Sequence, residues 1–236
     1  MRFKLIPTLV YLLVLPTLLA LGNWQLNRAE EKRQLLDLQE KQSEGPSITL
    51  MASTSDDPES LRYKKVSMTG HFDVAHQFLL DNQIHAGKAG YFVLTPFIIS
   101  DGNKAVLVNR GWLPANPNRA IIPVVGFSDT GSVITGRINQ FPSVGIKLAD
   151  AEIPSGDWPA LVQIVDSRVL ERKLGYPLFP FQVELDKNAA NGYVRDWQIT
   201  TAIPPEKHFA YAMQWFALDL TLTLLFVVYH FKNKNA

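Results

Sequence analysis

Two long apolar stretches lie near the ends of the 236-residue sequence and constrain its fold more than any other feature. Residues 5–22 carry no charged side chain, and residues 209–231 carry a single acid. At 1.5 Å per helical residue the two stretches reach roughly 27 and 34 Å, against a hydrocarbon core of about 30 Å. Each stretch is therefore predicted to cross a membrane as a helix, the second with some tilt.

Basic residues at the chain ends predict the orientation of these helices. Arg2 and Lys4 precede the first stretch, and Lys232 and Lys234 follow the second. Because cytoplasmic flanks are enriched in basic residues, both termini are predicted to be cytoplasmic, and residues 23–208 extracytoplasmic. Basic residues just outside the first stretch argue mildly against this, but they alternate with acids, and long loops translocate largely regardless of charge.

The first stretch has one alternative interpretation, a cleavable signal peptide. It combines a basic start, an apolar run and the small residues Ala20 and Gly22. The apolar run is longer than the usual run of about 7–15 residues, and the helical pattern continues past Gly22. We therefore favour an uncleaved anchor.

The segment between the two stretches is predicted to be one small β-rich domain with a helical N-terminal extension. Residues 23–43 are rich in good helix formers and end at Gly45-Pro46. Alternating apolar residues, broken by Gly, Asn and Asp, then indicate antiparallel strands in a twisted sheet or partial barrel, and Pro204-Pro205 ends the domain. Strands are predicted at 63–72, 77–83, 91–99, 105–114, 132–141, 181–186 and 193–200, with a strand and a short helix within 161–175 and a Pro-rich loop at 115–131. The fold class is an α+β membrane protein, with a transmembrane helix at 1–22, the domain at 23–208 and a second transmembrane helix at 209–231.

Composition excludes several kinds of site. The chain has no cysteine, which excludes disulfides, thiolate metal sites, iron–sulfur clusters and a Cys-based copper chaperone. A net charge of +1 without a basic run gives no reason to expect a nucleic acid partner. The common hydrolase, metalloprotease, P-loop and dinucleotide motifs are missing, so we predict a non-enzymatic protein. An extracytoplasmic enzyme with a non-local active site is the least favoured alternative.

One of the five histidines, His208, lies at the mouth of the second apolar stretch. At 100° per residue, the side chains of Tyr211, Trp215 and Asp219 fall within roughly 60° of it on a helix. One interpretation is an interfacial aromatic belt with His208 as a helix cap. The other is a site for an amphipathic ligand, in which the imidazole coordinates a metal centre such as haem iron.

Asp219 lies about 16 Å inward from His208, near the predicted bilayer midplane. An acid there costs about 2.5–3.5 kcal/mol, so it is expected to face protein and to have a partner. Tyr11 lies at a similar depth on the first helix, and we hypothesise that its hydroxyl, or protonation of Asp219, satisfies the carboxyl. The alternative is a tolerated acid that reaches water.

Three short stretches together resemble one protein family. They are LGNWQLNRAEEK at 21–32, VNRGWLP at 108–114, where a strand leads into a turn, and PPEKHFAYAMQWFALD at 204–219. Their order, their spacing and the two flanking anchors resemble the surfeit locus protein 1 family of cytochrome c oxidase assembly factors. The resemblance extends from Gly22 to about residue 225.

The resemblance implies a role in oxidase assembly. Family members help the catalytic subunit of haem-copper oxidases acquire or retain its haem, and some bacterial members are thought to bind haem a through the histidine that opens the second span. Here that residue is His208. The implied partners are oxidase subunit I, the haem a synthesis machinery and the lipid bilayer, in a bacterial inner membrane with the domain in the periplasm. No family role transfers to Asp219, where the family usually has a small or apolar residue.

The resemblance also implies a set of residues around the haem. Trp24 is expected to anchor the first helix at the interface, either alone or while also flanking the porphyrin, and Arg28 either to pair with the haem propionates or to be solvated at the surface. Tyr211 and Trp215 complete the predicted cofactor site. Gly111 is expected to allow a backbone conformation that is closed to other residues. We therefore predict an assembly factor that passes or protects haem a, and the alternative is a scaffold that stabilises the immature oxidase without binding haem.

Overall fold

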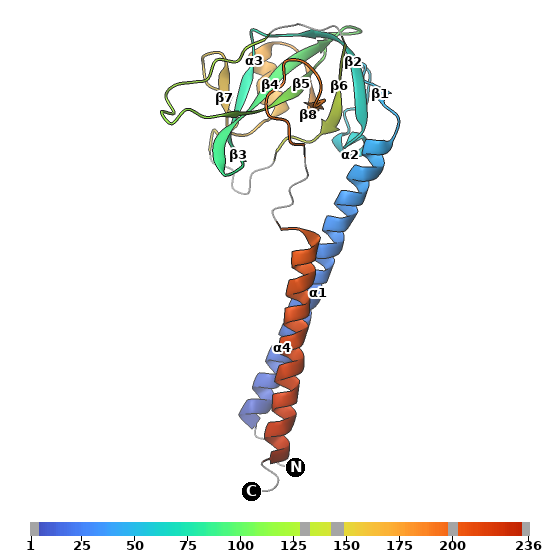
Figure 1. Ribbon diagram of the computed structural model, residues 1–236, viewed down its shortest axis with the longest axis vertical. Helices are drawn as coiled ribbons and strands as arrows, with labels where there is room; N and C mark the ends of the chain where they lie inside the picture. Colours follow the sequence, from blue (N-terminus) through green and yellow to red (C-terminus); the bar gives the residue numbers. More distant parts are fainter. Residues whose placement is uncertain (1–4, 128–132, 143–148, 198–202, 233–236) are drawn as a thin grey trace. The chain divides into compact units, whose positions relative to one another are not determined.

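The computed structural model describes residues 5–127, 133–142, 149–197 and 203–232, and the chain divides into two compact units. One unit comprises Met1–Leu38 and Gln198–Ala236, and contains most of the two long helices. The other comprises Gln39–Trp197 and contains the β-sheet (Figure 1).

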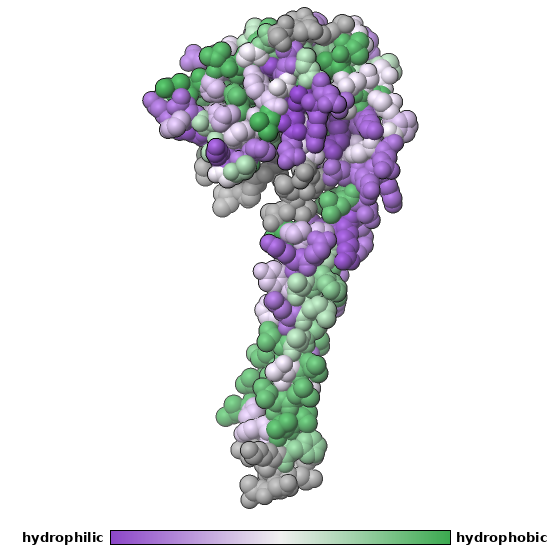
Figure 2. All heavy atoms as spheres, in the orientation of Figure 1, coloured by the Kyte–Doolittle hydropathy of each residue, from purple (hydrophilic) through white to green (hydrophobic). Residues whose placement is uncertain are grey.

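Two long helices form the helical unit. Helix α1 runs from Leu5 to Glu44 and helix α4 from Pro205 to Lys232. The structure thus confirms that the first helix continues past Gly22 and ends before Gly45. Proline suits the first position of α4, because the first amide of a helix has no partner within it. Both helices are long and apolar enough to cross a membrane, and Figure 2 shows hydrophobic side chains along most of α4 and the facing part of α1.

The two helices contact each other at several points. Gly22 of α1 allows this approach, since a Cβ there would lie 2.4 Å from the ring of Phe216 on α4. Further along, the Tyr11 hydroxyl lies 3.1 Å from the hydroxyl of Thr223. Tyr11 therefore hydrogen-bonds Thr223 and not Asp219, so the partner hypothesised for the acid is engaged elsewhere.

The β-sheet closes into a small barrel. The strand order is β1-β2-β6-β8-β5-β4-β3-β7, and β2 also pairs with β4, which joins β2, β6, β8, β5 and β4 in a ring. Strand β3 pairs with the N-terminal part of β4, and β7 pairs with the outer edge of β3. The bounds are β1 Ile48–Thr49, β2 Lys65–Phe72, β3 Phe78–His85, β4 Lys88–Ile99, β5 Ala105–Pro114, β6 Val133–Asn139, β7 Ala160–Val162 and β8 Leu178–Leu185, with short helices α2 Pro58–Leu61 and α3 Ser167–Leu174.

The core of this unit explains why β5 and β8 occupy the centre of the sheet. Nearly every residue of both strands is buried, as expected for strands covered on both faces. One apolar cluster fills the barrel and includes Phe97, Phe179 and Phe181, and a second cluster lies against α3 through Leu170. The rigid barrel therefore holds the polar groups described below in fixed positions.

Most strand predictions agree with the structure to within three residues, and β5 matches residue for residue. Two predictions were wrong. The sheet is mixed, because β1–β2, β3–β7 and β5–β8 are parallel pairs. The part of the 193–200 strand that the structure describes forms only an isolated bridge, between Val194 and Trp112. Side chains hold this segment instead: Trp197 donates to the carbonyl of Leu185 at 2.7 Å.

Candidate functional site

His208 lies in the first turn of α4 and faces α1. Its side chain is 8% exposed, and Nδ1 is 2.7 Å from Oε1 of Gln25 on α1. Because an amide oxygen only accepts hydrogen bonds, this contact places the imidazole proton on Nδ1. The neutral ring then carries its lone pair on Nε2, and this is how proteins orient a histidine for metal binding.

Trp24 and Arg28 lie next to Gln25 on α1, and both are half-exposed. The Arg28 guanidinium carbon is 5.7 Å from the centre of the Trp24 ring, and its Nη1 forms an ion pair with Glu31 at 2.7 Å. Exposed ion pairs of this kind are worth up to about 1 kcal/mol. Arg28 can therefore exchange Glu31 for another carboxylate at little cost.

The remaining predicted residues differ in their exposure. Trp215 is partly buried, whereas Tyr211 is 47% exposed. Ala212 is fully buried, so the buried side of α4 runs through His208, Ala212 and Trp215 and leaves Tyr211 at its margin. His208 contacts Gln25 and Arg28 contacts Trp24, so the predicted site includes residues of both helices.

These side chains fit a metalloporphyrin by their chemistry. An imidazole Nε2 suits an axial position on iron, half-exposed aromatic rings suit a flat apolar macrocycle, and a guanidinium suits carboxylates. The sequence did not single out Gln25, although the residue lies in the LGNWQLNRAEEK stretch. The only local signal was its place in that motif, because its partner is 183 positions away in the sequence.

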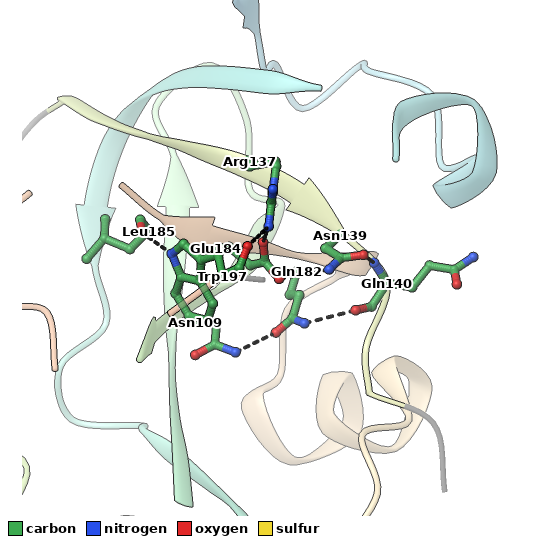
Figure 3. Close-up of polar contacts among 8 residues, drawn as sticks. All are labelled: Asn109, Arg137, Asn139, Gln140, Gln182, Glu184, Leu185 and Trp197. Atoms are coloured by element: carbon green, nitrogen blue, oxygen red, sulfur yellow. Dashed lines mark hydrogen bonds and ion pairs between the residues drawn. The ribbon is translucent and has the colours of Figure 1, made fainter. Parts of the chain in front are cut away.

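A second polar centre lies in the barrel, shown in Figure 3. Arg137 of β6 and Glu184 of β8 form an ion pair at 2.6 Å, and Asn139 donates to the other carboxylate oxygen at 2.8 Å. The Arg137 guanidinium also donates to the carbonyl of Trp197 at 3.0 Å. Arg137, Glu184 and Trp197 border a cavity of about 560 Å³. Because the two charges neutralise each other and both oxygens of Glu184 are occupied, we assign this centre a structural role.

Arg110, from the Asn-Arg-Gly-Trp stretch, is a buried cation. Its side chain is 1% exposed, and it donates to the carbonyls of Asn191 and Gly126 at 2.7 Å each and to the side chain of Gln77 at 2.8 Å. Burial lowers the pKa of the guanidinium. Arg110 therefore ties two loops to the sheet, a role that sequence reasoning did not assign.

Gly111 has the backbone conformation that was expected, with φ of 111°. A Cβ at this position would lie 2.6 Å from the carbonyl oxygen of Val194, so a side chain is excluded by space as well as by conformation. The residue lies within β5, however, and not in a turn.

Comparison with known proteins decides the family. The SURF1 family model matches residues 12–220. The chain belongs to the SURF1 family. Among the relatives of this SURF1 family protein, the SURF1-like protein of Rickettsia felis is 29% identical over 226 residues, which cover 94% of this chain and 95% of that protein. The SURF1-like protein of Rickettsia bellii is 30% identical over 226 residues, 94% of this chain and 89% of that protein. The cytochrome oxidase assembly protein SHY1 of Saccharomyces cerevisiae is 37% identical over 94 residues, 39% of this chain and 24% of that protein.

Proposed function

We propose that this protein assembles a haem-copper cytochrome oxidase by holding haem a through His208 until the haem enters subunit I. Membership of the SURF1 family supports the assembly role, since family members are cytochrome oxidase assembly factors. The haem a synthesis machinery would supply the cofactor. The role requires no catalytic group.

The two long helices would hold this site at a membrane surface. Their length and apolar character support a membrane crossing by each, and the basic flanks support cytoplasmic termini with the barrel on the outer side. His208 opens α4, which places the site at the outer mouth of the helical pair. In a bacterium this would be the periplasmic face of the inner membrane.

The observation that carries the proposal is the hydrogen bond between His208 and Gln25. It leaves Nε2 as the atom through which His208 would hold haem iron. Trp24 and Trp215 would contact the macrocycle, with Tyr211 at the margin. Arg28 would pair with a propionate in place of Glu31.

The test is the visible absorption spectrum of full-length protein, purified in detergent from cells that make haem a. We expect a haem band in the wild type and its loss in His208→Ala. His230→Ala is the matched control, because His230 lies at the other end of α4 and bonds the carbonyl of Phe226. We expect that control to keep its haem.

A colourless wild type, or His208→Ala with full haem occupancy, would contradict the proposal. Either result would favour the scaffold that stabilises the immature oxidase without binding haem. Both variants must be present at the wild-type level in the membrane for the comparison to count.

A further inference from the structure

Three charged side chains lie in a row across strands β2, β6 and β8. Lys65 is directly opposite Arg137 in the β2–β6 pairing, and Arg137 is directly opposite Glu184 in the β6–β8 pairing. All three line the cavity of about 560 Å³ described above. Like charges directly opposite each other destabilise a sheet, and Lys65 has no ion pair among the described residues. The cavity therefore lacks a negative charge beside Lys65.

A second unpaired cation, Lys187, lines the same cavity. It lies in the turn after β8 and also forms no ion pair with a residue that the structure describes. Two hydrogen bonds hold this turn, because Arg195 donates to the carbonyl of Ala189 at 2.9 Å and Thr135 donates to the carboxylate of Asp186 at 2.8 Å. Lys187 is therefore carried by a fixed piece of backbone.

The two acids of the lining already have counter-charges. Glu184 pairs with Arg137 at 2.6 Å (Figure 3). Asp186 lies near Arg195, where burial lowers the pKa of the guanidinium and the Asp186 carboxylate opposes that shift. The two lysines remain without a counter-charge, so a complementary ligand carries two negative charges.

The chemistry of the lining selects a phosphate monoester, which carries about 1.5–2 negative charges at pH 7. Lysine binds phosphate as a point charge, whereas carboxylates suit the fork of an arginine, and the fork of Arg137 is occupied by Glu184. The volume of the cavity lies within the range of roughly 300–1,000 Å³ that is typical of small-molecule sites. Trp197, fixed by its bond to the carbonyl of Leu185, supplies an aromatic wall for an organic group.

We propose that this cavity binds an organic phosphate monoester, whose phosphate pairs with Lys65 and Lys187 and whose organic part packs against Trp197. The Arg137–Glu184 pair keeps its structural role in the wall of the cavity. The inference does not depend on haem binding. A soluble ester and a lipid headgroup such as that of phosphatidic acid share this chemistry, and the second test separates them.

The first test titrates full-length protein in detergent with phenyl phosphate, followed by calorimetry. Lys65→Gln and Lys187→Gln should each weaken binding by about threefold or more, and the double variant should abolish it. Lys88→Gln is the matched control, since Lys88 is exposed on β4 and does not line the cavity. All of these variants should keep the urea midpoint of the wild type. A wild type that does not bind, or a double variant that binds equally well, would overturn the proposal.

Two further probes test the parts of the ligand. Inorganic phosphate lacks the ring that would contact Trp197, and phenyl sulfate has the same shape as phenyl phosphate with one negative charge. We expect both to bind more weakly than phenyl phosphate. Equal binding of inorganic phosphate would refute the contact with Trp197, and equal binding of phenyl sulfate would refute the recognition of two charges.

The second test identifies the source of the phosphate, with the full-length protein in phosphatidylcholine vesicles. Phosphatidic acid is compared with phosphatidylglycerol at equal surface charge as a competitor of phenyl phosphate. Competition by phosphatidic acid alone would assign the site to a lipid headgroup, and competition by neither lipid would assign it to a soluble ester. Equal competition by both would mean that the cavity responds only to membrane charge, and would overturn the proposal.

Discussion

Two ionisable side chains, one in each unit, differ in how their buried polar atoms are paired. Arg110 in the barrel donates to Gln77 and to the carbonyls of Gly126 and Asn191. Asp219 in the helical unit has a buried oxygen that no described residue bonds. Burial of an unsatisfied polar group is costly, so the hydrogen bonds of Arg110 stabilise its burial, whereas Oδ1 of Asp219 lacks this compensation among the described residues.

The same contrast holds for the aromatic residues. In the barrel, Phe97, Phe179 and Phe181 are fully buried in one cluster. In the helical unit, Trp24 and Tyr211 are about half-exposed near the histidine that opens α4. We infer that the barrel is a body for positioning and docking, and that the helical pair carries the working groups.

The largest effect is expected from removal of the buried guanidinium of Arg110. Arg110→Met removes the four hydrogen bonds of a buried guanidinium at once, so we expect a loss of about 3–5 kcal/mol in the free energy of unfolding. Urea unfolding of the full-length protein in detergent, followed by tryptophan fluorescence, measures it.

Arg119→Met is the matched control for that variant. Arg119 pairs with Asp81 at 2.7 Å, but its side chain is 44% exposed. We expect a loss under about 1 kcal/mol, as for other surface ion pairs. Equal losses from the two variants would mean that burial does not increase the contribution of Arg110 to the free energy of unfolding.

A smaller effect is expected in the helical unit, at the residue that orients His208. Gln25→Ala removes the acceptor of the Nδ1 proton, and loss of such a partner typically weakens metal binding by about 10–100-fold. Titration of the purified protein with haem a should show this weakening without a change in unfolding. Gln34→Ala is the control, since Gln34 is exposed on the same helix and bonds only Glu30. If both variants bind haem as the wild type does, Gln25 has no positioning role.

The smallest effect concerns the response of the barrel to acid. Burial alone would raise the pKa of Asp73, but hydrogen bonds from His76 and Tyr176 more than offset this and lower it below the usual 3.8. The carboxylate therefore adds stability above its usual pKa, and this contribution is lost as the pH falls through the lowered pKa of the folded state. Asp73→Asn should flatten the decline of the urea midpoint between about pH 5 and 2.5. A decline as steep as that of the wild type would rule out this role for Asp73.

Local sequence patterns predicted the parts of the fold that local forces determine. The lengths of the apolar runs predicted both helices, and alternation predicted β5 to the residue. The parallel pairing of β5 with β8 could not be predicted in this way, because pairing across distant parts of the chain leaves no mark on either strand alone.

The position of His208 could be predicted from the sequence, but its contacts could not. His208 was singled out because its place at the start of an apolar run is visible locally, and its role in a haem site stays a prediction. Its bond to Gln25 was missed because the partners lie on different helices. Depth counting brought Tyr11 near Asp219, but a shift of one helical turn gave its hydroxyl to Thr223 instead. Sequence spacing predicts the position of a residue along a membrane helix to within about one turn. A hydrogen bond requires a more accurate position than that.

The most direct test of the central claim is the haem a content of the oxidase in membranes of a host that lacks its own SURF1 family protein and receives this one. We predict that the wild type restores haem a in subunit I. His208→Ala, present at an equal level, should leave the content where it was without the protein. Full restoration of haem a by His208→Ala would contradict the account, because the helical pair would then assist assembly without its histidine.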